Sequence, residues 1–259
     1  MRKRPFIQRK PDTSWQNVAK WYKKAVGESG LYYHQRVIIP KSLELLKLQS
    51  NSSLFDLACG EGVFSRSIPK DTYYQGVDLS SDLIKFAREN SKHKFAKFDV
   101  SDVSKPLNIK KNDFTHGIIV LALQNIEDFD GVIKNASKHI KDNGKFLIVL
   151  NHPYFRIPRQ SSWEIDNAKK LQYRRVDRYL SELKIPINMH PGMQKTTQTW
   201  SFHRPLSKYL SSLSNNGFLV SNIEEWTSDK VSVGKAGKME NRARQEFPLF
   251  MAILAIKKA

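Results

Sequence analysis

The 259-residue sequence predicts an α/β protein built on a doubly wound, mostly parallel sheet. Two observations lead to this prediction. Short apolar runs alternate with amphipathic stretches between residues 53 and 150, which is the pattern of parallel strands with helices on both faces. The hydrophobic content of 40% over this length is also sufficient for a large packed core.

Five runs in this region have the length and composition of buried strands. They span residues 53–58, 72–78, 94–99, 114–123 and 145–150. Between them lie helical patterns at FSRSI, SDLIKFARENS and FDGVIKNASKHIKDNG. The third pattern ends in Asp-Asn-Gly, a helix-terminating turn in which Gly144 is predicted to adopt a positive φ.

The pattern differs on either side of this core. The N-terminal stretches TSWQNVAKWYKKAV and LYYHQRVIIPKSLELL predict helices. Residues 151–203 break the alternation and are predicted to form an irregular, polar insertion that contains aromatic residues. After the insertion, the sequence predicts a helix at PLSKYLSSLSNNG and two strands at FLVSNIEEW and EFPLFMAILAIK.

The net charge of +18 lies mainly in the flanks. Residues 1–52 carry 11 basic against 3 acidic residues, residues 151–203 carry 9 against 4, and residues 204–259 carry 9 against 5, whereas residues 53–100 are neutral and residues 101–150 carry +1. Two interpretations stay open. The basic flanks either hold an anionic partner, or every solvated face of the protein is rich in lysine.

The composition also indicates a compartment. No apolar run approaches the roughly 18 residues of a membrane span, and the basic N-terminus lacks the apolar segment of a secretory signal. The single cysteine, Cys59, excludes an internal disulfide and suits a reducing compartment. We therefore expect a cytoplasmic protein without a membrane span.

The first strand-to-helix turn, FDLACGEGVF, carries the chemistry. Gly60 and Gly62 let backbone amides approach a ligand at the start of a helix. A dinucleotide fingerprint would require a third glycine where Ser65 stands. The acid at the end of the strand, Asp56, would repel a pyrophosphate and favour a ligand with a positive charge near the turn. These features select S-adenosylmethionine, which carries a sulfonium and an ammonium.

The stretch DLACGEG, residues 56–62, is similar to the Asp/Glu-x-Gly-x-Gly-x-Gly motif of class I S-adenosylmethionine-dependent methyltransferases. Ala58 replaces the first glycine of that motif. Asp78 in GVDLSS matches the acid that accepts hydrogen bonds from both ribose hydroxyls. Asp99 in FDVSD matches the acid that meets the adenine amino group, and the resemblance implies that the backbone amide of Val100 meets a ring nitrogen.

The resemblance extends to LALQNIED, which looks like the stretch that lines the methionine portion and abuts the substrate. It is closest to the ubiquinone/menaquinone-methyltransferase-like branch, which acts mostly on small molecules. Each acid alone could be a helix cap or a turn former, but three at successive strand ends beside a glycine-rich turn favour a site. Cys59 serves as a small residue in the turn. The implied cofactor-binding residues are Asp56, Ala58, Cys59, Gly60, Gly62, Asp78, Leu79, Asp99, Val100, Leu121 and Gln124.

The resemblance implies a single methyltransferase domain with a Rossmann-like, seven-stranded sheet whose last strand is antiparallel. Its expected parts are an N-terminal helical lid at residues 1–52, a cofactor-binding core at 53–150, a substrate-side insertion at 151–203, and a C-terminal helix and strand pair at 204–259.

The fifth predicted strand is followed by Asn151, His152, Pro153 and Tyr154. This run looks like the Asn-Pro-Pro-Tyr clamp of adenine-amino methyltransferases, but that clamp follows the fourth strand, so its position argues against this substrate. We expect the run to border the substrate pocket; the alternative is that it only ends the strand. The candidate substrate-side residues are His34, Asn125, Asn151, Tyr154, Trp200, His203 and Arg204.

The insertion combines cations with aromatic residues in FRIPRQSSW, LQYRRVDRY and TWSFHR. Such combinations suit anionic or planar substrates, because arginine offers forked donors to carboxylate or phosphate and also stacks on rings. In the resembling family, the segment after the fifth strand and the N-terminal helices commonly set specificity.

The implied reaction transfers a methyl group to a substrate nucleophile and leaves S-adenosylhomocysteine. The candidate bases are the histidines His34, His152, His190 and His203, because the histidine pKa lies near working pH. We rank His152 first for its position. No His, Cys or carboxylate spacing indicates a metal site.

Three functions remain as alternatives at this stage. The first is methylation of a small-molecule acceptor that is anionic or aromatic. The second is an RNA methyltransferase whose basic flanks hold phosphates, and the third is a non-catalytic binding protein with this fold. The sequence does not predict an oligomeric state.

Overall fold

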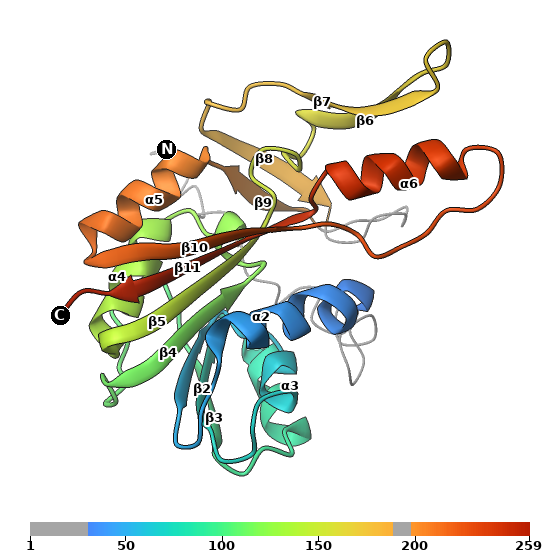
Figure 1. The fold of residues 1–259 in the computed structure, drawn as a ribbon. Coiled ribbons are helices and arrows are strands. Elements are labelled where there is room, and N and C mark those ends of the chain that lie inside the picture. The colour runs from blue at the N-terminus through green and yellow to red at the C-terminus, as the bar shows by residue number, and fades with distance from the viewer. Residues whose placement is uncertain (1–30, 189–197) are drawn as a thin grey trace, which may run out of the picture.

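The computed structural model describes residues 31–188 and 198–259 and confirms the predicted α/β architecture (Figure 1). Its centre is a seven-stranded sheet in the order β10-β11-β5-β4-β1-β2-β3. β11 runs antiparallel to both of its neighbours, and the pairs among β1 to β5 are parallel. The strands are β1 (Ser53–Leu57), β2 (Tyr73–Asp78), β3 (Ala96–Val100), β4 (Phe114–Val120), β5 (Ile140–Asn151), β10 (Phe218–Trp226) and β11 (Phe250–Lys257).

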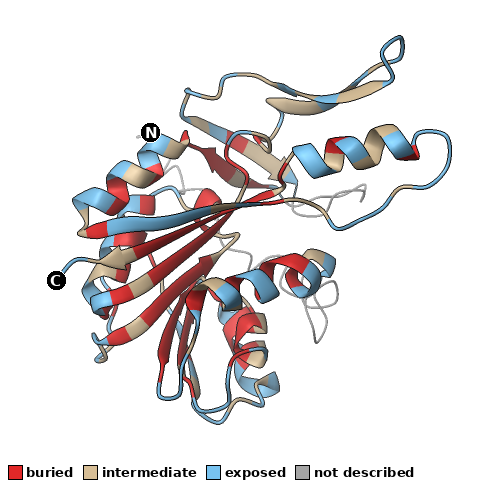
Figure 2. Cartoon of the chain, in the orientation of Figure 1, coloured by how far each residue is buried: buried red, intermediate tan, exposed pale blue. Residues whose placement is uncertain are grey.

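Helices cover both faces of the sheet, so the sheet is doubly wound. On one face, α4 (Phe129–His139) and α5 (Leu206–Asn215) pack on the strands. The other face is covered by η2 (His34–Ile38), α2 (Ile39–Leu46), η3 (Val63–Arg66) and α3 (Ser81–Asn90). Successive strand residues belong to opposite cores. Figure 2 shows the central strands of the sheet as mostly buried and the edge strand β10 as largely exposed.

The predicted turn at Asp-Asn-Gly differs from the structure. α4 ends at His139, and β5 begins directly at Ile140 and continues through these residues. The positive φ of 61° belongs to Asn143. Gly144 is required for space, because a Cβ there would lie 2.5 Å from Ile140 Cγ2.

The insertion is more regular than the sequence predicts. It contains two antiparallel hairpins, one of β6 (Ser161–Asp166) with β7 (Leu171–Val176), and one of β8 (Leu183–Asn188) with β9 (Gln198–His203). β6 and β7 were missed because they expose much of both faces and so lack a clean apolar alternation. β9 is mostly buried, but three of its buried residues, Thr199, Ser201 and His203, are polar, so it too lacks an apolar alternation.

One more helix was not predicted, and two predictions fall on residues that the structure does not describe. The sequence prediction also missed α6 (Gly237–Glu246), which contacts β7. The helix predicted at residues 13–26 and the candidate base His190 both lie outside the described residues.

The beginning of η2 is attached to the chain that follows β10. The hydroxyls of Tyr33 and Ser228 lie 2.9 Å apart, and the Tyr32 hydroxyl donates to Asp229 at 3.1 Å. The Tyr33 ring packs edge-on against Phe250, the first residue of β11, with 5.6 Å between ring centroids. Tyr32 and Tyr33, which belong to the lid predicted at residues 1–52, are therefore held at the carboxyl edge of the sheet; residues 32–33 are called the lid segment below.

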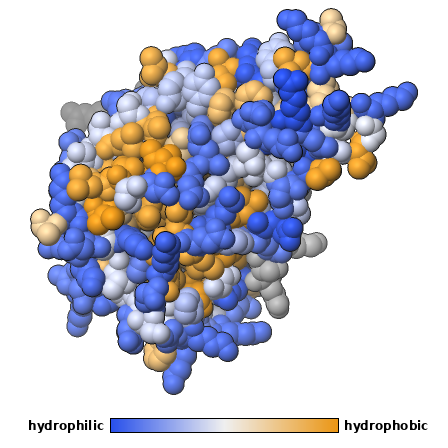
Figure 3. Space-filling view, in the orientation of Figure 1, coloured by the Kyte–Doolittle hydropathy of each residue, from blue (hydrophilic) through white to orange (hydrophobic). Residues whose placement is uncertain are grey.

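The surface is largely polar, with an apolar area over β10 and β11 in the view of Figure 3. Leu219, Val220 and Ile223 of β10 contribute exposed side chains. Within residues 31–188 and 198–259, no helix combines the length and apolarity needed to cross a membrane.

Candidate active site

The turn after β1 has an unusual backbone. Ala58, Gly60 and Gly62 all have left-handed φ values, of 58°, 57° and 74°. The carboxylate of Asp78, at the end of β2, accepts the Gly60 amide at 2.9 Å and the Ser80 amide at 2.8 Å. Asp78 therefore ties the turn to the neighbouring strand and keeps the remaining lone pairs of its carboxylate for a ligand.

The two glycines have different surroundings. A Cβ on Gly62 would lie 2.7 Å from Phe98 Cε1, whereas a Cβ on Gly60 would meet no atom within 4 Å. Gly62 is thus required by packing. Gly60 leaves open space at the turn, which is what close approach of a ligand to the backbone requires.

Asp56 lies beneath the turn and is 2% exposed. Burial raises its pKa from 3.8 to about 7; the hydrogen bond from Tyr74 opposes the shift, and the charge of Asp78 adds to it. The Tyr74 hydroxyl donates to Asp56 Oδ2 at 2.5 Å. A carboxyl group balanced between its two protonation states near pH 7 is driven to the carboxylate by a nearby cation.

The end of β3 is open to solvent. The Asp99 carboxylate accepts a hydrogen bond from Gln75 at 2.8 Å and lies 3.6 Å from Arg88. Leu79 and Val100 are each 45% exposed. Leu79 follows β2 and Val100 ends β3, so two exposed apolar side chains and an exposed carboxylate occur at the ends of these neighbouring strands, which suits a flat ring that carries an amino group.

The end of β4 presents a further polar group. Leu121 has a φ of 51°, an uncommon value for a branched residue, and its carbonyl accepts Gln124 Nε2 at 2.7 Å. Gln124 Oε1 is buried and has no hydrogen-bond partner among the described residues. This acceptor is available for a donor such as an ammonium.

Together these groups fit S-adenosylmethionine. Asp56 offers a carboxylate near the positive charge of the cofactor, and Gln124 offers an unpaired side-chain oxygen to a hydrogen-bond donor. Asp78 offers a second carboxylate with free lone pairs, and Gly60 leaves space for the ligand beside the backbone. Cys59 is buried, and burial raises its thiol pKa well above the usual range, so it is an inert small residue of the turn.

His152 is held by contacts on both ring nitrogens. The amides of Tyr154 and Phe155 point at Nδ1 from 3.2 and 3.3 Å, and Nε2 lies 2.7 Å from Glu225 Oε1. Because Nδ1 accepts, the proton is on Nε2 and is donated to Glu225. The side chain is buried, and burial lowers its pKa. These contacts stabilise the turn after β5 and leave no ring nitrogen for a proton from substrate.

Two more candidate residues have structural contacts. Buried Arg204 donates to the carbonyls of Ile126 and Glu127, at 3.0 and 2.6 Å, and so fixes the loop after β4. His203 is buried, and its Nε2 lies 2.7 Å from the Tyr179 carbonyl. Both side chains hydrogen-bond to backbone carbonyls of segments near the site and so hold those segments in place.

The other substrate-side candidates differ in exposure. Tyr154 is 41% exposed and Trp200 is half-buried with Lys184 5.2 Å from its ring. Asn125 is half-buried in η4 (Leu123–Asn125), beside the predicted methionine segment. Asn151 ends β5, and its side-chain oxygen accepts a hydrogen bond from Arg156 at 2.6 Å. His34 is buried in η2, and its Nδ1 has no partner among the described residues.

The structure contains a cavity of about 240 Å³ whose lining residues the sequence did not predict. Its lining comes from the turn after β5, from β6 and β7, and from the chain before β11. The cations and aromatic rings of the insertion were the available signal, but their convergence with the chain before β11 depends on the tertiary fold. The lining residues are Phe155, Arg156, Trp163, Arg174, Phe247, Pro248 and Leu249.

Ala58 stands where the resembling motif has glycine, and it carries the backbone strain of a left-handed φ. We expect Ala58→Gly to increase the free energy of unfolding by about 0.5 to 1 kcal/mol, because relief of strain exceeds the added entropy of the unfolded chain. Urea denaturation checks this expectation. A loss of stability would show that the Ala58 side chain contributes more through packing than it costs in strain.

The fold resembles those of known methyltransferases. An S-adenosylmethionine dependent methyltransferase from Mesorhizobium loti superposes with a TM-score of 0.65 at 23% identity, covering 84% of this chain and 96% of the other. One from Clostridium acetobutylicum ATCC 824 gives a TM-score of 0.60 at 18% identity, with 95% and 99% covered. At these identities the similarity establishes the fold. No curated protein sequence matches the chain.

Fold and site together define the class as an S-adenosylmethionine-dependent methyltransferase. Residues 48–178 match the family model described as "Methyltransferase domain", and the chain belongs to that family. The expected enzyme class and cofactor are thereby confirmed, while the ubiquinone/menaquinone branch stays a prediction.

Proposed function

We propose that this methyltransferase acts on a small-molecule acceptor that is anionic or aromatic. The observation that carries the cofactor part of the proposal is the Asp78 carboxylate, which joins the Gly60 amide to the end of β2. When bound, S-adenosylmethionine supplies an electrophilic methyl group on a sulfonium. The protein's own contribution is alignment, which is worth about 7 to 11 kcal/mol of barrier when donor and acceptor are held in a reactive pose.

The acceptor side is proposed to lie between the lid segment and the insertion. Tyr33 of the lid packs on Phe250, and Arg156 of the insertion also lies over that ring, with 5.4 Å from guanidinium to centroid. Aromatic side chains continue outward: Tyr154 packs against Phe155 and Tyr179, with 4.8 Å between centroids in each pair. A wall of this kind excludes water and suits a planar acceptor.

If the acceptor loses a proton during transfer, His34 is one candidate base with a ring nitrogen left over; His203, which donates from Nε2 to the Tyr179 carbonyl, is another. The Nδ1 of His34 is buried without a partner among the described residues, whereas His152 is bonded at both nitrogens. Burial lowers the pKa of His34, so it is neutral and able to accept a proton at pH 7.

One experiment tests the reaction and the acceptor class. Protein incubated with methyl-labelled S-adenosylmethionine is offered separate metabolite, lipid-quinone and RNA fractions, and the label in each is counted. We expect label in a small-molecule fraction. Label only in RNA would overturn this choice and favour the alternative suggested by the +18 charge; RNA binding would then weaken steeply with salt.

The histidines are compared in the fraction that accepts label. We expect His34→Gln to reduce the transfer rate by about 100-fold if a proton is removed. His152→Gln should leave the rate of the folded enzyme within about threefold and lower the free energy of unfolding by about 1 to 3 kcal/mol, because two amides lose their acceptor. The reverse result, with turnover lost in His152→Gln at full S-adenosylhomocysteine affinity, would restore His152 as the base.

A further inference from the structure

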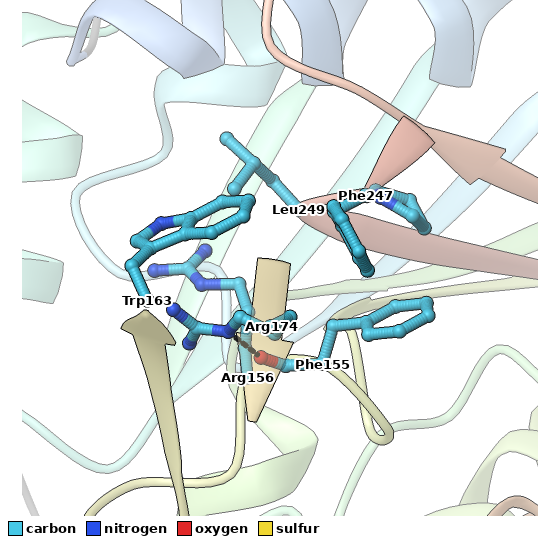
Figure 4. A pocket seen from close by; sticks show the side chains of 7 residues that line it. Phe155, Arg156, Trp163, Arg174, Phe247 and Leu249 are labelled. Carbon is cyan, nitrogen blue, oxygen red and sulfur yellow. Dashed lines mark hydrogen bonds between the residues drawn. The ribbon is translucent and has the colours of Figure 1, made fainter. Parts of the chain in front are cut away.

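Two arginines lie next to each other in the cavity between the insertion and β11. Figure 4 shows the guanidinium groups of Arg156 and Arg174 side by side below the Trp163 indole, with Phe155 and Phe247 across from them. The Arg174 guanidinium lies 5.1 Å from the Trp163 ring centroid. The cavity thus combines two forked cations with aromatic walls.

Neither arginine forms an ion pair with a carboxylate in the part of the chain that the structure describes. Arg156 donates to the side-chain oxygen of Asn151 at 2.6 Å. Arg174 donates to the Phe155 carbonyl at 2.8 Å and to the Ser161 hydroxyl at 2.9 Å. All three acceptors are neutral, so the charge of the pair is not compensated, and several of the five N–H groups on each guanidinium remain for a ligand.

Nearby arginines differ in this respect. Arg175, the next residue along β7, lies 3.4 Å from Asp177, and Arg244 of α6 lies 3.5 Å from Glu240. Arg175 is exposed, whereas Arg156 and Arg174 are half-buried. Two carboxylates of this region thus pair with other arginines, and a third, that of Glu164 in β6, accepts from the Ser162 hydroxyl.

Holding the pair together costs free energy in the absence of an anion. Burial lowers the pKa of both guanidiniums, and the charge of Arg174 lowers that of Arg156 further. A bound oxyanion would offset both effects, since carboxylate and phosphate match the guanidinium fork.

The cavity lies at the edge of the sheet that carries the cofactor turn. Leu249 precedes Phe250, which pairs with Asn151 at the end of β5. β5 and β11 are two and three strands away from β1, so at about 4.8 Å per strand the sideways distance alone from these strands to the glycine turn is about 10 to 14 Å. A ligand anchored at the arginines therefore has to extend along the sheet edge, beyond the ring held in the cavity, to bring a nucleophile to the methyl donor.

We propose that Arg156 and Arg174 bind the oxyanion, carboxylate or phosphate, of a planar aromatic acceptor whose ring packs against Trp163 and Phe247. This assignment deepens the proposed function and depends on it. A cavity of about 240 Å³ is below the usual range of about 300 to 1,000 Å³ for sites that enclose drug-sized ligands. The acceptor portion held here is therefore a single ring with its anionic group.

The test is calorimetry on the protein with three probes that share one benzene ring. Benzoate and phenyl phosphate carry the oxyanion, and benzamide is the neutral counterpart of benzoate. Each probe is titrated with S-adenosylhomocysteine present, and S-adenosylhomocysteine is also titrated alone. We expect one of the two anions to bind at least about tenfold more tightly than benzamide, since hydrogen bonds to charged groups contribute more than neutral ones.

Three variants separate the pocket from the general basic charge. Arg174→Gln should weaken anion binding by about tenfold or more, and the matched control Arg175→Gln, which removes the same charge from the adjacent position, should change it by less than about twofold. Arg156→Lys keeps the charge but loses the fork, so it should also weaken binding. If Arg174→Gln does not fold, Arg156→Lys still tests the arginine pair.

The outcomes distinguish the two proposals. If benzoate binds more tightly than phenyl phosphate, the acceptor carries a carboxylate. If phenyl phosphate binds more tightly, the acceptor carries a phosphate. If S-adenosylhomocysteine binds but benzamide matches the anions, or Arg174→Gln and Arg175→Gln behave alike, the arginine assignment is overturned and the methyltransferase function stands. If S-adenosylhomocysteine itself does not bind, the proposed function fails, and the arginine assignment that rests on it fails with it.

Discussion

Replacing Asp56 with Asn is expected to stabilise the folded protein at pH 8 while weakening its affinity for S-adenosylmethionine. Asp56 is buried, and its pKa is raised from 3.8 to about 7. A carboxylate at this position therefore costs folding free energy whenever the pH is high enough to ionise it. Asparagine keeps an oxygen to accept the Tyr74 hydroxyl and has no charge to bury.

The direction of the pH dependence follows from proton binding. Between about pH 4 and pH 7 the folded state keeps a proton on Asp56 that the unfolded chain has released, so the free energy of unfolding falls as the pH rises. About three pH units at 1.36 kcal/mol per unit set an upper value of about 4 kcal/mol, complete above pH 7. We expect Asp56→Asn to gain about 2 to 4 kcal/mol at pH 8 and nearly nothing at pH 4.

Folding favours the protonated form of Asp56, whereas cofactor binding should favour the ionised form. A cation near the turn favours the ionised carboxyl, so the affinity of the natural sequence for S-adenosylmethionine should rise about tenfold from pH 6 to pH 8. Asp56→Asn should bind more weakly and lose this dependence.

Urea denaturation at pH 4 and 8 and calorimetry at pH 6 and 8 measure both effects. The control is Asp113→Asn, on the surface beside Lys111, whose side-chain hydrogen bond lowers the Asp113 pKa; this variant should show no gain at pH 8. Equal stability of Asp56→Asn and the natural sequence at both pH values would contradict a buried ionisable group at this position.

Gly60→Ala and Gly62→Ala are expected to separate cofactor binding from folding. Both residues have positive φ, so each alanine costs about 1 kcal/mol in backbone strain. At Gly62 the new Cβ would also lie 2.7 Å from Phe98, which adds about 1 to 3 kcal/mol of overpacking. Gly62→Ala should therefore lose about 2 to 4 kcal/mol of stability and Gly60→Ala only about 1.

At Gly60 the added methyl points into open space, which is the space assigned to the ligand. Gly60→Ala should lose about tenfold or more in S-adenosylhomocysteine affinity, whereas Gly62→Ala at low temperature should lose less. Thermal denaturation and calorimetry on the two variants provide the comparison. Full affinity in Gly60→Ala would place the cofactor away from this turn.

The core of the fold was readable because each strand of the parallel sheet is a short apolar run followed by a turn signal. The limits of the strands and of α3 agree with the predictions to within a few residues, apart from β5, which begins at Ile140. The β6–β7 hairpin of the insertion was not readable, because it is held by cross-strand pairs on two half-exposed faces and not by one buried face. In β9 most residues are buried, but several of them are polar, so the sequence shows no apolar alternation there.

The sequence predicted the type of site, but not the surroundings of its individual side chains. The spacing of Asp56, Asp78 and Asp99 indicated three acids at one edge, but only the structure shows that Asp56 is buried under Tyr74 while Asp99 is open. His152 was ranked by position, and its contacts to Glu225 and two amides could not be read from neighbouring residues, because Glu225 is 73 positions away.

The place of β11 in the sheet has a consequence for the order of folding. β11 lies between β5 and β10, and its Ile253 pairs with Ile148. The strands from β1 to β5 can associate as soon as they have emerged from the ribosome, but β10 has no neighbour until β11 is synthesised and inserted beside β5. During synthesis the nascent sheet therefore ends in an unpaired β5 edge, and this stage is the one at which we expect the chain to depend most on a chaperone.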